Sequence, residues 1–347
     1  MRTIRLGRSG LIVSAVALGC LPIQRVGMDE AKKILRKAYD SGITYYDTAN
    51  KYTDSEEKIG NALSDVRHHI IISTKTDAKD KATAQKHIEN SLRMLKTDYI
   101  DLIQFHNPRT LPDRYDPNSP WAALDEAVQK GYILHVGVTN HGLDNAIEAV
   151  HSGHYETVQF PFSYISTEKE VALTELCKEN DVGFIAMKGL CGGMLTDSAA
   201  CYAFARAHDN VVPIWGVQTM EELEDWLRYE EHPPVLDEDM MRRIEADRAK
   251  YSGDFCRACG YCLPCAADIN IPTAARIETL LGRSPWQKFM SDSAYDEMHR
   301  IDNCINCRAC ASRCPYSLDT PALLKHMLAY YDDFYHAHGG TRGLEKA

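Results

Sequence analysis

The sequence predicts a (β/α)8 barrel followed by a small, mainly α-helical, cysteine-rich domain. Two observations support this prediction. Short β-rich segments alternate with longer amphipathic segments eight times between Val16 and Glu230, which is typical of repeated βα units and a parallel sheet. Eight of the twelve cysteines then fall between Cys256 and Cys314, in two similar runs. We therefore expect an α/β protein whose barrel site lies at the C-terminal ends of the strands.

The eight expected strands are residues 16–19, 43–49, 69–76, 99–106, 133–140, 157–164, 182–188 and 211–217. The helices between and after them are expected near residues 28–41, 54–64, 82–95, 119–131, 142–151, 167–179, 195–209 and 219–230. The pattern ends at Pro233 and Pro234, because consecutive prolines cannot continue a helix. The predicted organisation is a barrel at 1–232, a linker and connecting helix at 233–252, a cysteine-rich domain at 253–335 and a tail at 336–347.

The composition is that of a globular protein of 347 residues, with 44% hydrophobic and 25% charged residues. A formal net charge of −10 argues against nucleic acid or a membrane surface as the main partner. No apolar run reaches the roughly 18 residues that a membrane span needs. The run from Leu11 to Cys20 follows three arginines, but its glycines and its short length favour a buried strand over a signal peptide. We expect a cytoplasmic protein whose clustered cysteines bind metal.

The two cysteine runs repeat one unit, in which three cysteines spaced CxxCxxC are followed by a fourth. The first run is Cys256, Cys259, Cys262 and Cys265, and the second is Cys304, Cys307, Cys310 and Cys314. Three cysteines at this spacing turn their thiolates toward one iron–sulfur cube, and a remote cysteine completes the site. Zinc is the alternative, disfavoured because it takes only four ligands and rarely uses such triplets.

The segment from Cys304 to Pro315 fits CxxCxxCxxxCP and resembles the bacterial ferredoxins with two [4Fe-4S] clusters. In that pattern, the last cysteine of each run ligates the other cluster. The resemblance implies one cluster at Cys256, Cys259, Cys262 and Cys314, and another at Cys304, Cys307, Cys310 and Cys265. The first run departs from the pattern in two ways. Only two residues, and not three, separate Cys262 from Cys265, and the proline at 264 precedes the last cysteine instead of following it. The other cysteines are interpreted as buried and structural, although Cys191 lies in a glycine-rich loop that a ligand could contact.

Polar residues mark the ends of three consecutive strands of the expected barrel. Asp47 and Tyr52 follow the second strand, Lys75 ends the third and His106 ends the fourth. Each alone is more often a packed or hydrogen-bonded residue, but together they compose a proton-donating site. An ammonium beside a phenol lowers its pKa, so Lys75 would activate Tyr52 as the acid. Asp47 would keep Lys75 protonated, and His106 would hydrogen-bond a substrate carbonyl.

The segments at residues 42–49 with Tyr52, 73–75 and 101–106 together resemble the aldo-keto reductase superfamily. The likeness covers residues 1 to about 230. It implies a TIM barrel that binds NADPH or NADH without a Rossmann fold and reduces aldehydes and ketones, or oxidises alcohols. It also implies that Tyr52, Lys75, His106 and Asp47 are the catalytic residues. The implied cofactor residues are Thr139, Asn140 and Gln159 at the carboxamide, the loop of Lys188, Gly189, Leu190 and Gly192 at the pyrophosphate, and Gly216 after the eighth strand.

Two positions depart from the superfamily. Met187 stands where many members stack an aromatic ring on the nicotinamide. The segment after the eighth strand carries Glu222 and no basic residue, although NADPH enzymes commonly place cations there. Because a carboxylate would repel the 2′-phosphate, the choice between NADPH and NADH stays open.

The whole chain resembles the subgroup of aldo-keto reductases fused to a C-terminal ferredoxin-like domain. Hydride transfer moves two electrons and each cluster exchanges one, so the halves need an intermediate; a flavin would bridge them, but the sequence carries no flavin signature. The cluster domain could instead be structural, act as a redox sensor, or exchange electrons with a ferredoxin or another redox partner. The first hypothesis is a nicotinamide-dependent oxidoreductase acting on a small carbonyl or alcohol. The alternative is an electron-transfer or redox-sensing protein whose barrel binds a nucleotide or a partner with little turnover.

Overall fold

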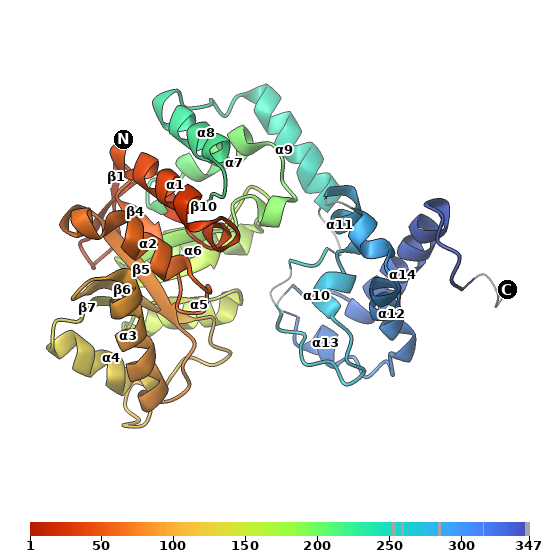
Figure 1. Cartoon of the computed structure of the whole chain (residues 1–347), viewed down its shortest axis with the longest axis horizontal. Helices are drawn as coiled ribbons and strands as arrows, with labels where there is room; N and C mark the ends of the chain where they lie inside the picture. Colours follow the sequence, from red (N-terminus) through yellow and green to blue (C-terminus); the bar gives the residue numbers. More distant parts are fainter. Residues whose placement is uncertain (252–254, 258–259, 284–285, 315, 344–347) are drawn as a thin grey trace. The chain divides into compact units, whose positions relative to one another are not determined.

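The computed structural model in Figure 1 describes residues 1–251, 255–257, 260–283, 286–314 and 316–343. The chain divides into two compact units, Met1–Ala246 and Asp247–Ala347. The division falls inside the segment 233–252 that the sequence predicts as a linker and connecting helix. Each unit is built around its own apolar core.

The first unit contains a closed barrel of eight parallel strands, which confirms the predicted fold class. The strands are β3 (Ala17–Gly19), β4 (Tyr45–Asp47), β5 (Ile71–Thr76), β6 (Ile100–His106), β7 (Ile133–Thr139), β8 (Thr157–Pro161), β9 (Gly183–Met187) and β10 (Val211–Gly216). Each strand is shorter than predicted, because the backbone pairing between neighbouring strands ends before the β-rich stretch of sequence ends. The register Leu18↔Trp215 between β3 and β10 closes the barrel.

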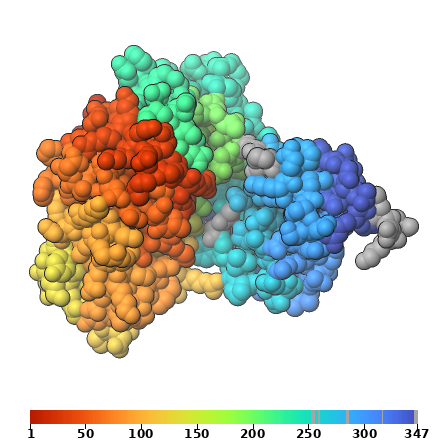
Figure 2. Space-filling model, in the orientation of Figure 1, coloured from red at the N-terminus to blue at the C-terminus, as the bar shows by residue number. Residues whose placement is uncertain are grey.

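Eight helices follow the barrel strands. They are α1 (Met28–Asp40), α2 (Ser55–Leu63), α3 (Lys81–Leu95), α4 (Pro120–Gln129), α5 (Leu143–Ser152), α6 (Glu168–Glu179), α7 (Ser198–Arg206) and α8 (Met220–Glu231). Local sequence sets several of their starts: Thr167 and Thr219 each form a capping box with the glutamate three residues later. The first and last of these helices, α1 and α8, lie side by side where the helical ring closes (Figures 1 and 2).

An N-terminal hairpin, which the sequence patterns did not predict, plugs one end of the barrel. Strands β1 (Thr3–Arg5) and β2 (Ile12–Ser14) pair antiparallel, and Leu6 and Val13 join the barrel core beside Leu102. Gly7 takes a positive φ of 50°, and a Cβ there would lie 2.2 Å from the Gly183 nitrogen. Only glycine fits this close approach. Because the N-terminal ends of the strands are filled, the opposite end remains for a site.

The second unit is mainly α-helical, as predicted. Its helices are α9 (Glu238–Tyr251, which begins in the first unit), α10 (Ile271–Ala274), α11 (Ile277–Arg283), α12 (Asp292–His299), α13 (Ala309–Ser312) and α14 (Thr320–Ala337). Apolar residues of these helices, including Ile277, Leu324 and Tyr331, form the core, and several cysteines pack against it. The predicted boundary between domain and tail, at 335/336, falls inside α14. In the described part of the chain, no helix is long and apolar enough to cross a membrane.

Candidate functional site

The side chains at the C-terminal end of the barrel are brought together by the alternation of the strands. Asp47 pairs in register with Ser73, and Lys75 pairs with Gln104 two residues further along. Alternate residues of a strand point to the same face, so these positions and His106 line the barrel interior. Three neighbouring strands thus supply the polar residues that the sequence singles out.

Asp47 and Lys75 form a buried ion pair. The Lys75 Nζ donates to Asp47 Oδ1 at 2.5 Å and to the Thr48 carbonyl at 2.6 Å, and both charged residues are 2% exposed. Burial lowers the pKa of Lys75, whereas the adjacent Asp47 carboxylate opposes that shift. The predicted pairing of these two residues is therefore present in the structure.

Tyr52 and His106 lie next to this ion pair. The Lys75 Nζ is 5.5 Å from the centre of the Tyr52 ring, and the Tyr52 and His106 ring centres are 5.7 Å apart at an interplanar angle of 80°. Burial raises the pKa of Tyr52 well above its usual value, and the Asp47 charge adds to the rise. This direction is opposite to the predicted lowering by Lys75. The physical reason is that the Lys75 charge is already neutralised by Asp47, so desolvation of the phenolate dominates.

Burial also lowers the pKa of His106 to about 3, and the nearby Lys75 charge contributes. The imidazole is therefore neutral near pH 7. A neutral ring has one N–H donor, which suits the predicted role of hydrogen-bonding a carbonyl oxygen. A cavity of about 200 Å³ lies beside His106, lined mainly by the segments after β5 and β6.

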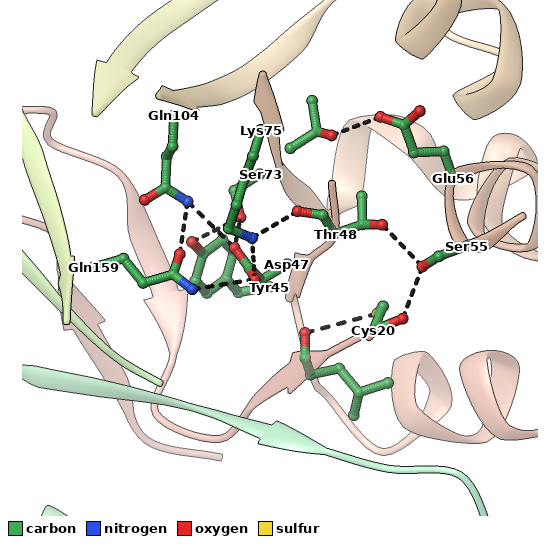
Figure 3. A network of polar contacts seen from close by, with 12 residues as sticks. Cys20, Tyr45, Asp47, Thr48, Ser55, Glu56, Ser73, Lys75, Gln104 and Gln159 are labelled. Atoms are coloured by element: carbon green, nitrogen blue, oxygen red, sulfur yellow. Dashed lines mark hydrogen bonds and ion pairs between the residues drawn. The ribbon is translucent and has the colours of Figure 1, made fainter. Parts of the chain in front are cut away.

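A network of donors surrounds the Asp47 carboxylate, as Figure 3 shows. Ser73 Oγ donates to Oδ2 at 2.6 Å, and Gln104 Nε2 donates to the same oxygen at 3.3 Å and to Gln159 Oε1 at 2.8 Å. Gln159 Nε2 lies 3.5 Å from Asp47 Oδ1. Because a carboxylate only accepts, it fixes the orientation of both amides. Gln104 and Ser73 were not predicted from the sequence, although each stands two residues before a predicted catalytic residue, on the same face of its strand.

The residues predicted at the nicotinamide carboxamide lie at the ends of β7 and β8. Thr139 and Gln159 are buried and adjacent in register. Asn140 follows β7 and is fully buried; its Nδ2 donates to the Pro108 carbonyl at 2.9 Å, and its Oδ1 accepts from the Gly142 nitrogen at 2.8 Å. The structure thus brings the three together, but Asn140 already uses its amide to hold two loops.

The loop predicted at the pyrophosphate follows β9 and bends sharply. Lys188 and Gly192 both have positive φ, at 59° and 68°. A Cβ on Gly189 would lie 2.6 Å from Cζ3 of Trp215, so a side chain there would clash with the indole. This loop also contains Leu190, and Gly216 ends β10. Met187, at the end of β9, is half-buried.

The cysteines outside the two runs fall largely where the sequence analysis placed them. Cys20, Cys177 and Cys201 are buried. Cys191 is partly exposed in the loop after β9, with its Sγ 3.3 Å from Ser163 Oγ. A bystander role for the first three agrees with their burial.

In the second unit, four thiols line a single cavity of about 90 Å³. They are Cys265, Cys304, Cys307 and Cys310, the set implied for the second cluster. Cys256, Cys262 and Cys314 of the other set lie against the same apolar core, whereas Cys259 and Pro315 lie outside the described residues. No group of three or more Cys, His, Asp or Glu side chains in the described chain is arranged to hold a single metal ion.

Comparison with known proteins identifies both units. The barrel, with a buried lysine–carboxylate pair beside a tyrosine and a neutral histidine, is that of an oxidoreductase, and residues 15–200 match the Aldo/keto reductase family. The chain belongs to that family. Residues 255–319 match a 4Fe-4S dicluster domain, so the C-terminal unit is an iron–sulfur domain.

Relatives cover the barrel rather than the whole chain. The oxidoreductase YqkF of Bacillus subtilis is 32% identical over 211 residues, which is 57% of this chain and 67% of that protein. The aldo-keto reductase YhdN of the same organism is 33% identical over 210 residues, 54% and 62% of the two chains. The holo structure of aldo-keto reductase AKR11C1 from Bacillus halodurans aligns with a TM-score of 0.61 at 23% identity, over 71% of this chain and 96% of that one. The chain thus spans 67% and 62% of the two Bacillus subtilis relatives and 96% of the Bacillus halodurans structure.

Proposed function

We propose that the barrel catalyses nicotinamide-dependent reduction of a small carbonyl compound, or oxidation of the corresponding alcohol, with Tyr52 as the proton donor or acceptor. The observation that supports this most is the buried Lys75–Asp47 pair, 2.5 Å long, beside the Tyr52 ring. Binding a nucleotide alone requires no buried charge pair next to a phenol. A barrel that keeps one is equipped to move a proton.

The four residues have distinct roles in this proposal. Tyr52 carries the proton at neutral pH, because burial raises its pKa. Lys75, held by Asp47 and the Thr48 carbonyl, lies 5.5 Å from the centre of the Tyr52 ring and would offset part of the desolvation cost of the phenolate that forms on proton donation. Neutral His106 would hydrogen-bond the carbonyl oxygen and orient it toward Tyr52.

The chain's own residues fit a nicotinamide nucleotide at the open end of the barrel. The loop after β9 packs so closely on the Trp215 indole that only glycine fits at position 189, which favours a fixed loop conformation at this end of the barrel. The cofactor, when bound, would supply or accept the hydride. Thr139, Gln159 and the loop after β9 would hold it, with Asn140 fixing the shape of the adjacent loops.

We expect NADH to be preferred to NADPH. Glu222 Oε2 accepts from the backbone nitrogens of Gln218 and Thr219 at 2.8 and 3.3 Å, at the start of α8. A helix start usually attracts a phosphate, but here a carboxylate already occupies its donors. A 2′-phosphate would meet this negative charge.

The two clusters would act as one-electron carriers for a redox partner, or as a redox sensor, with crossed ligation by the last cysteine of each run. The cavity lined by Cys265 together with Cys304, Cys307 and Cys310 supports the crossed arrangement. No comparison points to a flavin, and none is included in the proposal.

Tyr52→Phe tests the barrel chemistry. Anaerobically purified full-length protein is assayed for oxidation of NADH and NADPH with a panel of aldehydes and ketones, and its iron content is measured. The variant should lose turnover by at least about a hundredfold, the lower range for general acid catalysis, while retaining iron and cofactor binding. Tyr46→Phe is the control, because Tyr46 is a buried tyrosine of β4 whose hydroxyl donates to the Ile43 carbonyl and takes no part in the proposed proton transfer. Unchanged turnover in Tyr52→Phe would refute the assignment.

A second candidate is an electron-transfer or redox-sensing protein with little barrel turnover. Cys307 is exposed, so a cluster bound there would lie near the surface, where a ferredoxin-like partner could reach it. This candidate is favoured if the carbonyl panel gives no turnover in the wild type while cluster reduction changes the binding of a redox partner.

A further inference from the structure

The side chain of Arg313 joins the two cysteine runs. Its Nε donates to the Ala309 carbonyl at 2.8 Å. Its Nη1 and Nη2 donate to the carbonyls of Leu263 and Pro264, at 3.2 and 3.0 Å. One guanidinium therefore binds backbone from both runs, across about fifty positions of sequence.

Two of the three carbonyl acceptors of Arg313 lie directly before cysteines. Ala309 precedes Cys310 and Pro264 precedes Cys265, and both cysteines line the same cavity. A guanidinium is planar and its donors point in fixed directions, so it sets the relative orientation of the peptides it binds. Arg313 is therefore placed to set how Cys265 faces the second run.

Cys265 needs such a constraint, because its own run differs in length from the other. Two residues separate Cys262 from Cys265, whereas three separate Cys310 from Cys314. Local loop geometry cannot place both last cysteines in the same way. The residue before Cys265 is a proline, so the first run has no counterpart of Arg313.

Arg313 also brings a positive charge to one cavity. It lines the cavity of Cys265, and an arginine keeps its charge at every physiological pH. Arg308 lines the same cavity, but its Nη2 donates to Asp319 at 3.2 Å, which offsets its charge. Reduction adds negative charge to a cluster, so a nearby fixed cation favours the reduced state.

We propose that Arg313 is a positioning residue for the cluster ligand Cys265, and that its charge makes the cluster at Cys265, Cys304, Cys307 and Cys310 the more readily reduced of the two. This inference rests on the crossed ligation proposed above.

The test is a potentiometric titration of the anaerobic full-length protein, followed by electron paramagnetic resonance so that the two clusters are read separately. Arg313→Gln should shift the cluster of Cys265, Cys304, Cys307 and Cys310 to more negative potential by more than it shifts the other cluster. Arg313→Lys keeps the charge but loses the guanidinium that binds both cysteine runs. Its cluster potentials should stay near wild type, while a ferrous chelator removes iron from the cluster of Cys265 faster. Arg308→Gln is the matched control, because it leaves the Arg313 hydrogen bonds in place and should not change the rate of iron loss.

Cys265→Ser tests the crossed ligation separately from the role of Arg313. This variant should alter the same resonance signal that Arg313→Gln shifts, which would support both the ligation and the role of Arg313. If Cys265→Ser alters the signal of the cluster bound by Cys256 and Cys262, the crossed ligation is wrong. If Cys265→Ser behaves as expected but Arg313→Gln shifts neither potential, or both equally, and Arg313→Lys loses iron no faster than wild type, the role of Arg313 is wrong.

Discussion

The two units hold their reactive side chains in different ways. In the barrel, strands place Asp47, Lys75 and Gln104 in the interior, and the protein itself neutralises the charges and supplies donors to the carboxylate. In the iron–sulfur unit, Cys262 is part of the apolar core, most of the other described cysteines pack against that core, and Cys307 is exposed. The charged residues of the barrel site are held by contacts within the polypeptide, whereas the cysteine runs are joined by Arg313 and, in our proposal, by the clusters they bind.

Charge follows the same division. Residues 247–347 contain equal numbers of basic and acidic residues, so the formal charge of −10 belongs to residues 1–246. Cluster ligands must be thiolates, so cluster binding adds negative charge to a unit that is otherwise balanced. Cations close to a cluster, such as Arg313, therefore act on it with little competition from a net charge of the surrounding unit.

The largest expected effect comes from Cys310→Ser. It should remove one cluster and cost the second unit several kcal/mol of stability, because metal-binding free energy is folding free energy in small metal domains. Iron content, limited proteolysis and NADH binding measured on the full chain check this. Iron should fall and cleavage should appear beyond residue 246, while NADH binding is retained. Loss of NADH binding together with iron would contradict the independence of the two sites.

Asp47→Ala tests whether the barrel site is held by its buried ion pair. Removing the carboxylate leaves the Lys75 ammonium buried without its partner, which costs about 3–5 kcal/mol in comparable pairs. Chemical denaturation of the barrel, followed by tryptophan fluorescence, measures the loss. Arg5→Gln breaks an exposed pair with Asp181 and serves as the control, with little change expected. Equal effects of the two variants would argue that Asp47 is not structurally coupled to Lys75.

Two barrel histidines should contribute to the pH dependence of stability. Burial lowers the pKa of both His106 and His141 to about 3. Between about pH 6.5 and 3 the unfolded chain binds these protons and the folded barrel does not, so stability falls as the pH falls through this window. Each histidine contributes up to about 1.4 kcal/mol per pH unit. Replacing His106 by Gln should reduce the slope of unfolding free energy against pH; an unchanged slope would show that His106 is protonated in the folded state.

The smallest effect is expected from Glu222→Gln. Removing the negative charge at the start of α8 should improve NADPH binding relative to NADH by about 0.3–1 kcal/mol, the usual size of a charge effect at a helix end. Fluorescence titration with both nucleotides measures the ratio. Glu221→Gln, one residue earlier in the same turn, is the control. A ratio that is the same in the wild type and both variants would place the adenosine phosphate elsewhere.

Much of this architecture was readable from sequence. Eight alternations of β-rich and amphipathic segments predicted eight strands because period-2 and period-3.6 patterns are local properties. The cysteine spacing predicted an iron–sulfur domain because ligand geometry constrains short loops. The N-terminal hairpin was missed, since two three-residue strands give almost no periodic signal.

The sequence by itself determined which residue types stand at the strand ends, and therefore the candidates Tyr52, Lys75 and His106. Only the tertiary structure decided their electrostatics. The sign of the Tyr52 pKa shift depends on how deeply the phenol is buried and on the neutralisation of Lys75 by Asp47. Both depend on contacts between segments that are distant in sequence. The same holds for Gln104 and Arg313, whose contacts join segments dozens of residues apart and leave no local pattern to read.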